Sequence, residues 1–242
     1  MTDADSETWL QERLGDPADD LYFAVLFAGP HRRPAAAAAA ALYVELEAIA
    51  TRFRDLNVAR TKLAWWRDEL DRLDSGRPAH PATKALAEAG ADRSVTPLLD
   101  VITGMELVLL EGPVTDLATA QMRAERATAP FAVALTALLA PEEAAPGRFS
   151  ALGEAVGLAR LLGGDHSATL RQSLAEDARG RILDTAEAAR EAQPPLQVLT
   201  ALAWRRSDRV SSGEPDRRGS RMRVFTAWRA GRGRLPRALR RA

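Results

Sequence analysis

The sequence has no cysteine and little else of what usually carries chemistry. The missing cysteine excludes disulfides, thiolate metal sites and a cysteine nucleophile. The three histidines, His31, His80 and His166, are far apart and lack the spacing of zinc ligands. There is no glycine-rich phosphate loop and no nucleophile-elbow pattern. β-Branched and aromatic residues are sparse, which disfavours an extensive sheet.

Long hydrophobic runs are missing as well. The longest, residues 34–44 and 127–141, are too short and too rich in alanine to cross a bilayer. Residues 1–20 are acidic and contain no apolar core of a secretory signal. We therefore expect a cytoplasmic protein, and peripheral contact with a membrane surface stays open.

The net charge of the chain is zero, but the charge is unevenly distributed. Residues 205–242 contain thirteen arginines against Asp208, Glu214 and Asp216, which gives this segment a charge of +10. Residues 1–204 therefore carry −10. We divide the chain into a helical domain, 1–204, and an arginine-rich C-terminal segment, 205–242. The asymmetry predicts either an anionic partner for the segment or docking of the segment on the acidic domain.

Apolar residues recur with the spacing of one helix face in several segments. Turn clusters at residues 29–30, 75–78, 112–113 and 141–147 separate these segments. Thr115 or Asp116 is expected to cap a helix that runs to about Ala140, with a kink at Pro130. We predict an all-α orthogonal helical bundle. The residues expected in its core are Leu46, Ile49, Phe53, Leu63, Trp66, Leu70, Ile102 and Leu109.

Several segments, in this order, resemble the squalene/phytoene synthase family. They are residues 21–28 with Arg32 and Arg33, 42–47, 63–70, 76–81, 126–131 and 152–159. The resemblance covers about residues 20–165. It implies the isoprenoid synthase fold, which has a cavity between its helices. Active members condense two prenyl diphosphates head to head, with Mg²⁺ held by two aspartate-rich motifs on facing helices. Mg²⁺ needs several carboxylate oxygens to bridge a diphosphate.

This chain departs from the family pattern at both motifs. The first falls at residues 47–51, where Glu47 keeps a carboxylate but Ala48 and Thr51 replace the other acids. The second falls at residues 163–166, where only a displaced Asp165 remains. The pattern is similar to a catalytically degenerate branch that includes the mitochondrial complex I assembly factor. Residues 43–46, followed by Arg67, carry that comparison.

The leading hypothesis is a non-catalytic binding or assembly protein, a pseudoenzyme that needs no cofactor. The degenerate motif positions are Glu47, Thr51 and Asp165, and we assign no catalytic residue. The alternative is a prenyltransferase that condenses prenyl diphosphates head to head and needs Mg²⁺. A third interpretation is a lipid carrier, which keeps a prenyl or other lipid ligand in the cavity. An enzyme would need several convergent carboxylates on two helices.

Individual residues leave alternatives open. Glu45 and Glu47 lie on different helix faces, and either solvent exposure, a buried ion pair or residual metal binding explains them. The cavity is expected to be lined by Tyr43, Trp66 and Arg123, the last of which stands where the family usually has tyrosine. Trp66 suits core packing as well as a prenyl-binding wall.

The C-terminal segment combines basic and aromatic residues. The contacts expected with an anionic surface are Arg221, Arg223, Phe225, Trp228 and Arg229. A membrane surface or a protein partner fits this composition, and a purely solubilising tail is the alternative. RNA phosphates with stacked bases are the least favoured ligand.

Overall fold

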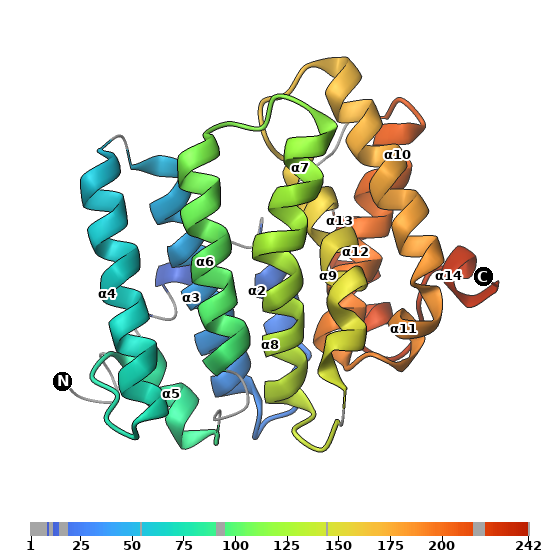
Figure 1. The fold of residues 1–242 in the computed structure, drawn as a ribbon. Coiled ribbons are helices and arrows are strands. Elements are labelled where there is room, and N and C mark those ends of the chain that lie inside the picture. Colours follow the sequence, from blue (N-terminus) through green and yellow to red (C-terminus); the bar gives the residue numbers. More distant parts are fainter. Residues whose placement is uncertain are drawn as a thin grey trace.

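The computed structural model describes residues 9, 12–14, 19–53, 55–90, 95–143, 145–214 and 221–241, apart from the side chains of Arg221 and Arg241. Within these ranges the chain is helical and contains no strand (Figure 1). The helices are α2 (Asp20–Leu26), α3 (Arg33–Arg52), α4 (Leu56–Asp74), α5 (Pro81–Glu88), α6 (Val95–Glu111), α7 (Leu117–Arg123), η2 (Ala124–Thr128), α8 (Ala129–Leu139), η3 (Pro146–Phe149), α9 (Ser150–Leu161), α10 (Ala168–Asp184), α11 (Ala186–Glu191), α12 (Pro194–Ser211), α13 (Arg221–Ala230) and α14 (Arg237–Arg241). The predicted all-α fold is confirmed.

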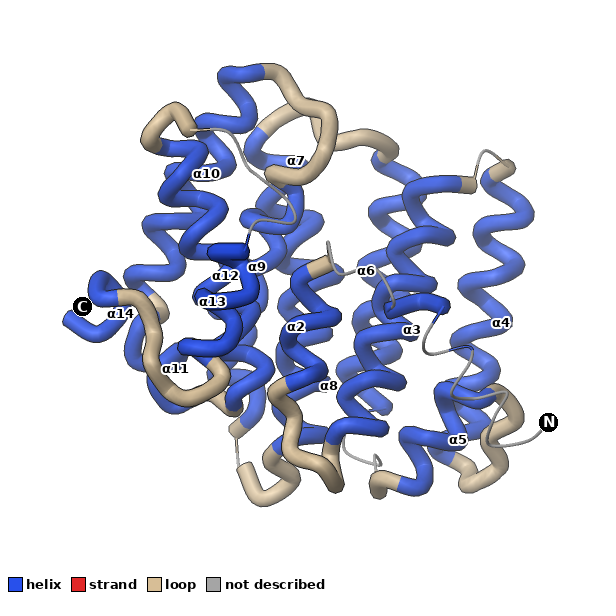
Figure 2. Tube along the Cα trace, turned by 180° about the vertical axis from the view of Figure 1, so that it is seen from behind, coloured by secondary structure: helices blue, strands red, loops and turns tan. Residues whose placement is uncertain are grey.

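The helices form two layers. In Figure 1, α4, α6, α8, α9 and α10 follow one another across the molecule, and each packs against the next. Behind them lie α3, α2, α12 and α13, which come forward when the molecule is seen from behind (Figure 2). Because α3 also contacts α6 and α8, and α12 also contacts α9 and α10, the two layers share one core.

Helix α3 lies inside this core because nearly all of its faces are apolar. Its alanines favour helix and are almost all buried, so neighbouring helices approach it closely. It is the one described helix whose length and composition would allow it to cross a membrane, but most of its apolar stretch is buried inside the bundle. A core helix with this composition passes the same test.

The predicted core is confirmed at seven of the eight positions, and Phe53 is wrong. Phe53 follows the last residue of α3 in extended conformation, and 37% of it is exposed. The helical spacing that predicted its burial ends one residue earlier. Its ring lies instead under the ammonium group of Lys62, which is 4.8 Å from the ring centroid.

A π-helix joins α7 to α8. The sequence predicted a kink at Pro130, and the structure places the π-helix Ala124–Thr128 just before that proline. Pro130 has no N–H, so a regular α-helix would leave the carbonyl of Arg126 without its usual donor. Asp116, one of the two predicted caps, accepts from the N–H of Thr119 at 2.8 Å and begins α7.

Glycines bring the neighbouring helices close to the π-helix. A Cβ on Gly104 of α6 would lie 1.9 Å from the carbonyl oxygen of Arg126. On the opposite side, a Cβ on Gly157 of α9 would lie 2.8 Å from Cβ of Thr128. The absence of a side chain at these positions therefore sets the distance of both helices from η2.

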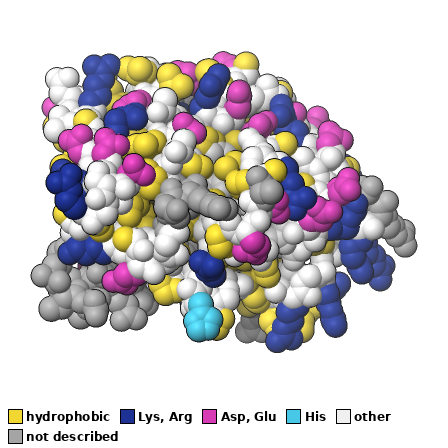
Figure 3. Space-filling model, turned by 60° about the horizontal axis from the view of Figure 1, so that its bottom comes forward, with side chains coloured by type: hydrophobic (Ala, Val, Ile, Leu, Met, Phe, Trp, Pro, Cys, Tyr) yellow, Lys and Arg dark blue, Asp and Glu magenta, His cyan; other side chains and the backbone are white. Residues whose placement is uncertain are grey.

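The C-terminal segment is packed against the bundle. Helix α12 runs through the expected boundary at residues 204 and 205 without interruption. Helix α13 contacts α12 and α2, and α14 contacts α10 and α11. In the bottom view, basic side chains gather at the edge of the molecule on the side of α14 (Figure 3).

His80 caps α5 and lies among tryptophans. Its Nδ1 accepts a hydrogen bond from the backbone N–H of Ala82 at 3.2 Å, which requires a deprotonated Nδ1. Its ring lies 4.7 Å from Trp9 and 4.6 Å from Trp66, measured between centroids. Burial among these rings lowers the pKa of His80, although the charges of Glu69 and Glu45 oppose it.

We expect Gly104→Ala to lower the free energy of unfolding by about 3 kcal/mol, because the added methyl group meets backbone that cannot easily move. Gly180→Ala in α10 is the matched control. A Cβ at Gly180 would meet no atom within 4 Å, so this change should raise stability by about 0.5–1 kcal/mol. Urea unfolding of both variants measures the difference, and equal effects would contradict the close approach.

We expect the stability of the protein to decrease as the pH falls below about 6.5, because the unfolded chain then binds a proton that folded His80 resists. The stability that neutral His80 contributes is fully present above about pH 6.5. It is lost as the pH falls through the lowered pKa of His80 in the folded protein. His80→Asn keeps a capping group that does not titrate and should flatten this part of the profile. His31→Asn, at an exposed histidine, is the control variant.

Candidate functional site

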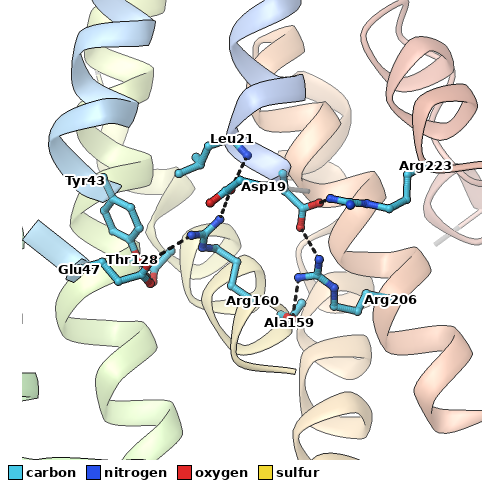
Figure 4. Close-up of polar contacts among 10 residues, drawn as sticks. Asp19, Leu21, Tyr43, Glu47, Thr128, Ala159, Arg160, Arg206 and Arg223 are labelled. Atoms are coloured by element: carbon cyan, nitrogen blue, oxygen red, sulfur yellow. Dashed lines mark hydrogen bonds and ion pairs between the residues drawn. The ribbon is translucent and has the colours of Figure 1, made fainter. Parts of the chain in front are cut away.

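A buried arginine lies between two carboxylates in the middle of the bundle (Figure 4). Arg160 of α9 donates from Nη1 to Oδ1 of Asp19 at 2.8 Å and from Nη2 to Oε2 of Glu47 at 3.2 Å. Asp19 caps α2 by accepting from the N–H of Leu21, and Glu47 belongs to α3. The carboxylate at the first degenerate motif therefore forms an ion pair within the chain.

Tyr43 lies one turn before Glu47 on the same face of α3 and completes the cluster. Its hydroxyl group is 3.0 Å from Oγ1 of Thr128, the last residue of the π-helix. The guanidinium group of Arg160 lies over its ring, 5.6 Å from the centroid. Helices α2, α3 and α9 and the π-helix thus all contribute to the cluster.

The charges in the cluster stabilise one another. Burial alone would raise the pKa of Asp19, but the charge and hydrogen bond of Arg160 and the N–H of Leu21 lower it. Burial disfavours charge on Arg160, yet Asp19 and Glu47 hold its pKa well above the usual value. Burial also raises the pKa of Tyr43 well above its usual value, so its phenol stays neutral.

Little space remains beside these residues. A cavity of about 20 Å³ is lined by Tyr43, Glu47, Thr51, Arg123 and Arg160 together with apolar residues of α6, η2 and α9. A second cavity of about 10 Å³ lies on the other side of Tyr43, Thr128 and Arg160. A cavity needs at least roughly 10–15 Å³ to hold one water molecule, so the two together hold only one or two. Neither of these two cavities encloses enough space for a prenyl chain.

Arg123, a predicted cavity residue, and Thr51, a position of the first motif, both line this cavity. Arg123 donates to the carbonyl oxygen of Gly112 at 2.5 Å. Burial lowers its pKa, while the charges of Glu47 and Glu111 act in the opposite direction. Thr51 turns its hydroxyl group back to the carbonyl of Glu47, 2.7 Å away.

The second degenerate motif does not face the first. Asp165 is exposed in the turn after α9 and lines neither cavity. The ring of His166 lies against Gly164, so a Cβ there would be 2.6 Å from Nε2. The same nitrogen is 2.9 Å from the carbonyl oxygen of Leu161 and caps the end of α9. An acidic side chain at Gly164 would have to displace this ring.

The carboxylates do not fit a Mg²⁺ site. Among the described residues, no three acidic or histidine side chains converge closely enough to hold a metal ion. Glu47 and Asp19 face Arg160, and a guanidinium group between two carboxylates excludes a divalent cation from the same place. Glu45 points elsewhere and pairs with Arg13 at 2.6 Å. Both glutamates of α3 are therefore engaged in ion pairs.

Two of the predicted site residues, Trp66 and Arg223, are buried. Trp66 is buried but lines neither cavity, because it packs against Trp65 and His80 between α4 and α5. Arg223, expected at an anionic surface, is only 5% exposed and forms an ion pair with buried Asp20. Arg206 pairs with the same carboxylate at 3.1 Å. Phe225 and Trp228 are exposed as predicted, and the side chain of Arg221 lies outside the described part.

Sequence reasoning missed Asp19, Arg160 and Thr128. Asp19 carried a usable signal, because an aspartate directly before an apolar helical run is typical of an N-cap. Arg160 carried another, since it follows Val156 by four residues on an otherwise apolar face. A single arginine on such a face indicates a buried ion pair. Thr128 had no signal, because the π-helix that positions it was not predicted.

The fold is an all-α helical bundle of the isoprenoid synthase type. A solved structure described as a dehydrosqualene synthase in complex with ligand matches the chain with a TM-score of 0.65. The match covers 94% of this chain and 96% of that one at 15% identity, and it therefore shows a shared fold. The chain belongs to the squalene/phytoene synthase family, whose model matches residues 15–183. A search of curated proteins gave no match.

We expect Arg160→Met to lower the free energy of unfolding by about 3 kcal/mol, because it leaves the half-buried carboxylate of Asp19 without its cation. This is the lower end of the range for a buried pair, since Glu47 is partly exposed. The triple change Asp19→Asn, Glu47→Gln and Arg160→Met removes all three charges and should recover most of the loss. Urea unfolding tests both, and an unchanged midpoint for Arg160→Met would refute the role of the pair.

Proposed function

We propose that this protein is a non-catalytic member of the squalene/phytoene synthase family that acts as a binding or assembly factor. The observation that supports this most is the position of Arg160 between Glu47 and Asp19. An active site for prenyl diphosphates needs carboxylates that are free to bind Mg²⁺. Here the carboxylate that remains from the first motif is already neutralised by a cation of the chain itself.

The small volume of the two cavities beside Arg160 supports the same proposal. Condensation of two prenyl diphosphates needs a cavity that encloses both chains, whereas the two cavities around Tyr43 total about 30 Å³, the sum of about 20 and about 10. The lipid-carrier interpretation meets the same obstacle. A family member without a catalytic site would act by binding a partner at its surface. This agrees with the resemblance of the sequence to the degenerate branch that includes the complex I assembly factor.

We expect no release of diphosphate and no condensed product when the full-length protein is incubated with farnesyl or geranylgeranyl diphosphate and Mg²⁺. The physical reason is that no carboxylate pair is available to hold the metal against the diphosphate charge. An active dehydrosqualene synthase assayed in parallel shows that the substrates and detection work.

The alternative is the prenyltransferase that the family implies. Mg²⁺-dependent turnover that Glu47→Ala abolishes and Asp165→Ala leaves unchanged would establish an enzyme centred on the first motif. Turnover that survives Glu47→Ala would point to contamination. Binding of the prenyl diphosphate without turnover, detected by calorimetry, would favour the carrier.

A further inference from the structure

Helix α13 is amphipathic in an unusual sense, because its large apolar side chains point outward. At 100° per residue, Val224, Phe225 and Trp228 fall on one side of the helix, with Met222 at the edge. All four are substantially exposed, Phe225 at 49% and Trp228 at 39%. The inward side carries Ala227 and Ala230, which are small and completely buried.

The inward side is fixed by an ion pair. Arg223 is buried and pairs with Asp20, which also pairs with Arg206 of α12 (Figure 4). At the end of α13, Gly231 lies so close to Phe27 that a Cβ would be 2.1 Å from the ring. These contacts hold the helix against α2 and α12 in one orientation. The outward position of Phe225 and Trp228 therefore follows from how the helix is anchored.

Arginines frame the exposed apolar side chains. The guanidinium group of Arg232 lies 4.5 Å from the centroid of Trp228, and that of Arg229 lies 5.7 Å from Phe225. Phe225 and Trp228 stack on each other at 6.0 Å. Arg234, Arg237 and Arg240 are also exposed. Residues 221–241 contain no acidic residue at all.

We propose that the outward face of α13, together with the exposed arginines that follow it, docks on an anionic lipid bilayer. A shallow apolar strip with tryptophan and phenylalanine, bordered by basic side chains, matches the interfacial region of such a bilayer. The rings enter at the level of the headgroups while the arginines contact the lipid phosphates. This goes beyond the proposed function and does not depend on whether the protein is catalytic.

The combination of charged and apolar side chains favours a lipid bilayer over a protein groove or a nucleic acid as the binding partner. An apolar protein groove would match the aromatic strip but not the arginines that follow it in the same segment. A nucleic acid would match the charge, but four neighbouring apolar side chains on one helix face, two of them aliphatic, exceed what base stacking needs. Exposed apolar patches of this kind mark interaction sites. The bilayer is the partner that uses both components.

The test is co-sedimentation of the full-length protein with vesicles of phosphatidylcholine, with or without phosphatidylserine, at low and high salt. Truncation after Trp204 is unsuitable, because it would cut α12 and remove both cations of Asp20. We expect binding to the anionic vesicles and little to the neutral ones. Binding should weaken with salt but persist in part, because ring insertion is not screened.

Two pairs of variants separate the components. Arg234→Gln with Arg240→Gln should weaken binding about 30-fold, since each basic residue near the surface contributes about 5-fold. Phe225→Ser with Trp228→Ser should remove the part that persists in high salt. The matched controls lie on the far side of the molecule, on α3 and α4: Arg52→Gln with Arg60→Gln, and Leu56→Ser with Val58→Ser. Both control pairs should bind like the natural protein.

A spectroscopic readout guards against misfolded variants. Because the chain has no cysteine, Val224→Cys offers one site for an environment-sensitive fluorophore, and Val58→Cys on α4 is its control. Anionic vesicles should shift the emission to the blue at position 224 only. The proposal is overturned by equal shifts at both positions, by absence of binding to anionic vesicles at low salt, or by controls that lose as much as the test pairs. Tighter binding to single-stranded RNA than to vesicles would likewise replace it with a nucleic-acid surface.

Discussion

Two adjacent aspartates at the start of α2 join this short helix to α9, α12 and α13. Asp19 binds Arg160 of α9, while Asp20 binds Arg206 of α12 and Arg223 of α13. Both stand at a helix N-terminus, where the backbone N–H groups favour negative charge. Three helices distant in sequence are therefore fixed to one turn of a short helix, and the loss of either carboxylate would remove an ion pair that joins α2 to them.

The opposite charges of the acidic domain and the basic segment partly neutralise each other inside the folded chain. The acidic domain and the basic segment meet at Asp20, which satisfies part of the positive charge of the segment in the interior. The remaining arginines stay at the surface around α13 and α14. Composition alone presents docking on the acidic domain and an outward-facing basic surface as alternatives. In the structure, some arginines of segment 205–242 pair with Asp20 and others face outward.

The helices and most of the core could be predicted from the sequence, because apolar side chains at helical spacing define a buried face. Phe53 could not, since the spacing does not tell where α3 ends. The pair of Asp19 and Arg160 joins residues 141 positions apart, and no local pattern gives such a partner. Arg223 was misplaced for a similar reason: composition assigns a charge to a segment but does not say which arginine faces the interior.

The π-helix between α7 and α8 has a consequence for how this fold tolerates change in length. A π-turn holds one residue more than an α-turn, so its closing hydrogen bond here joins the N–H of Ala129 to the carbonyl of Ala124. The π-turn therefore takes up one extra residue between α7 and α8, and deleting a single residue from Ala124–Thr128 would allow a continuous α-helix over the same stretch. The helix segments on either side would keep close to their present orientation, because the turn itself absorbs the change in length.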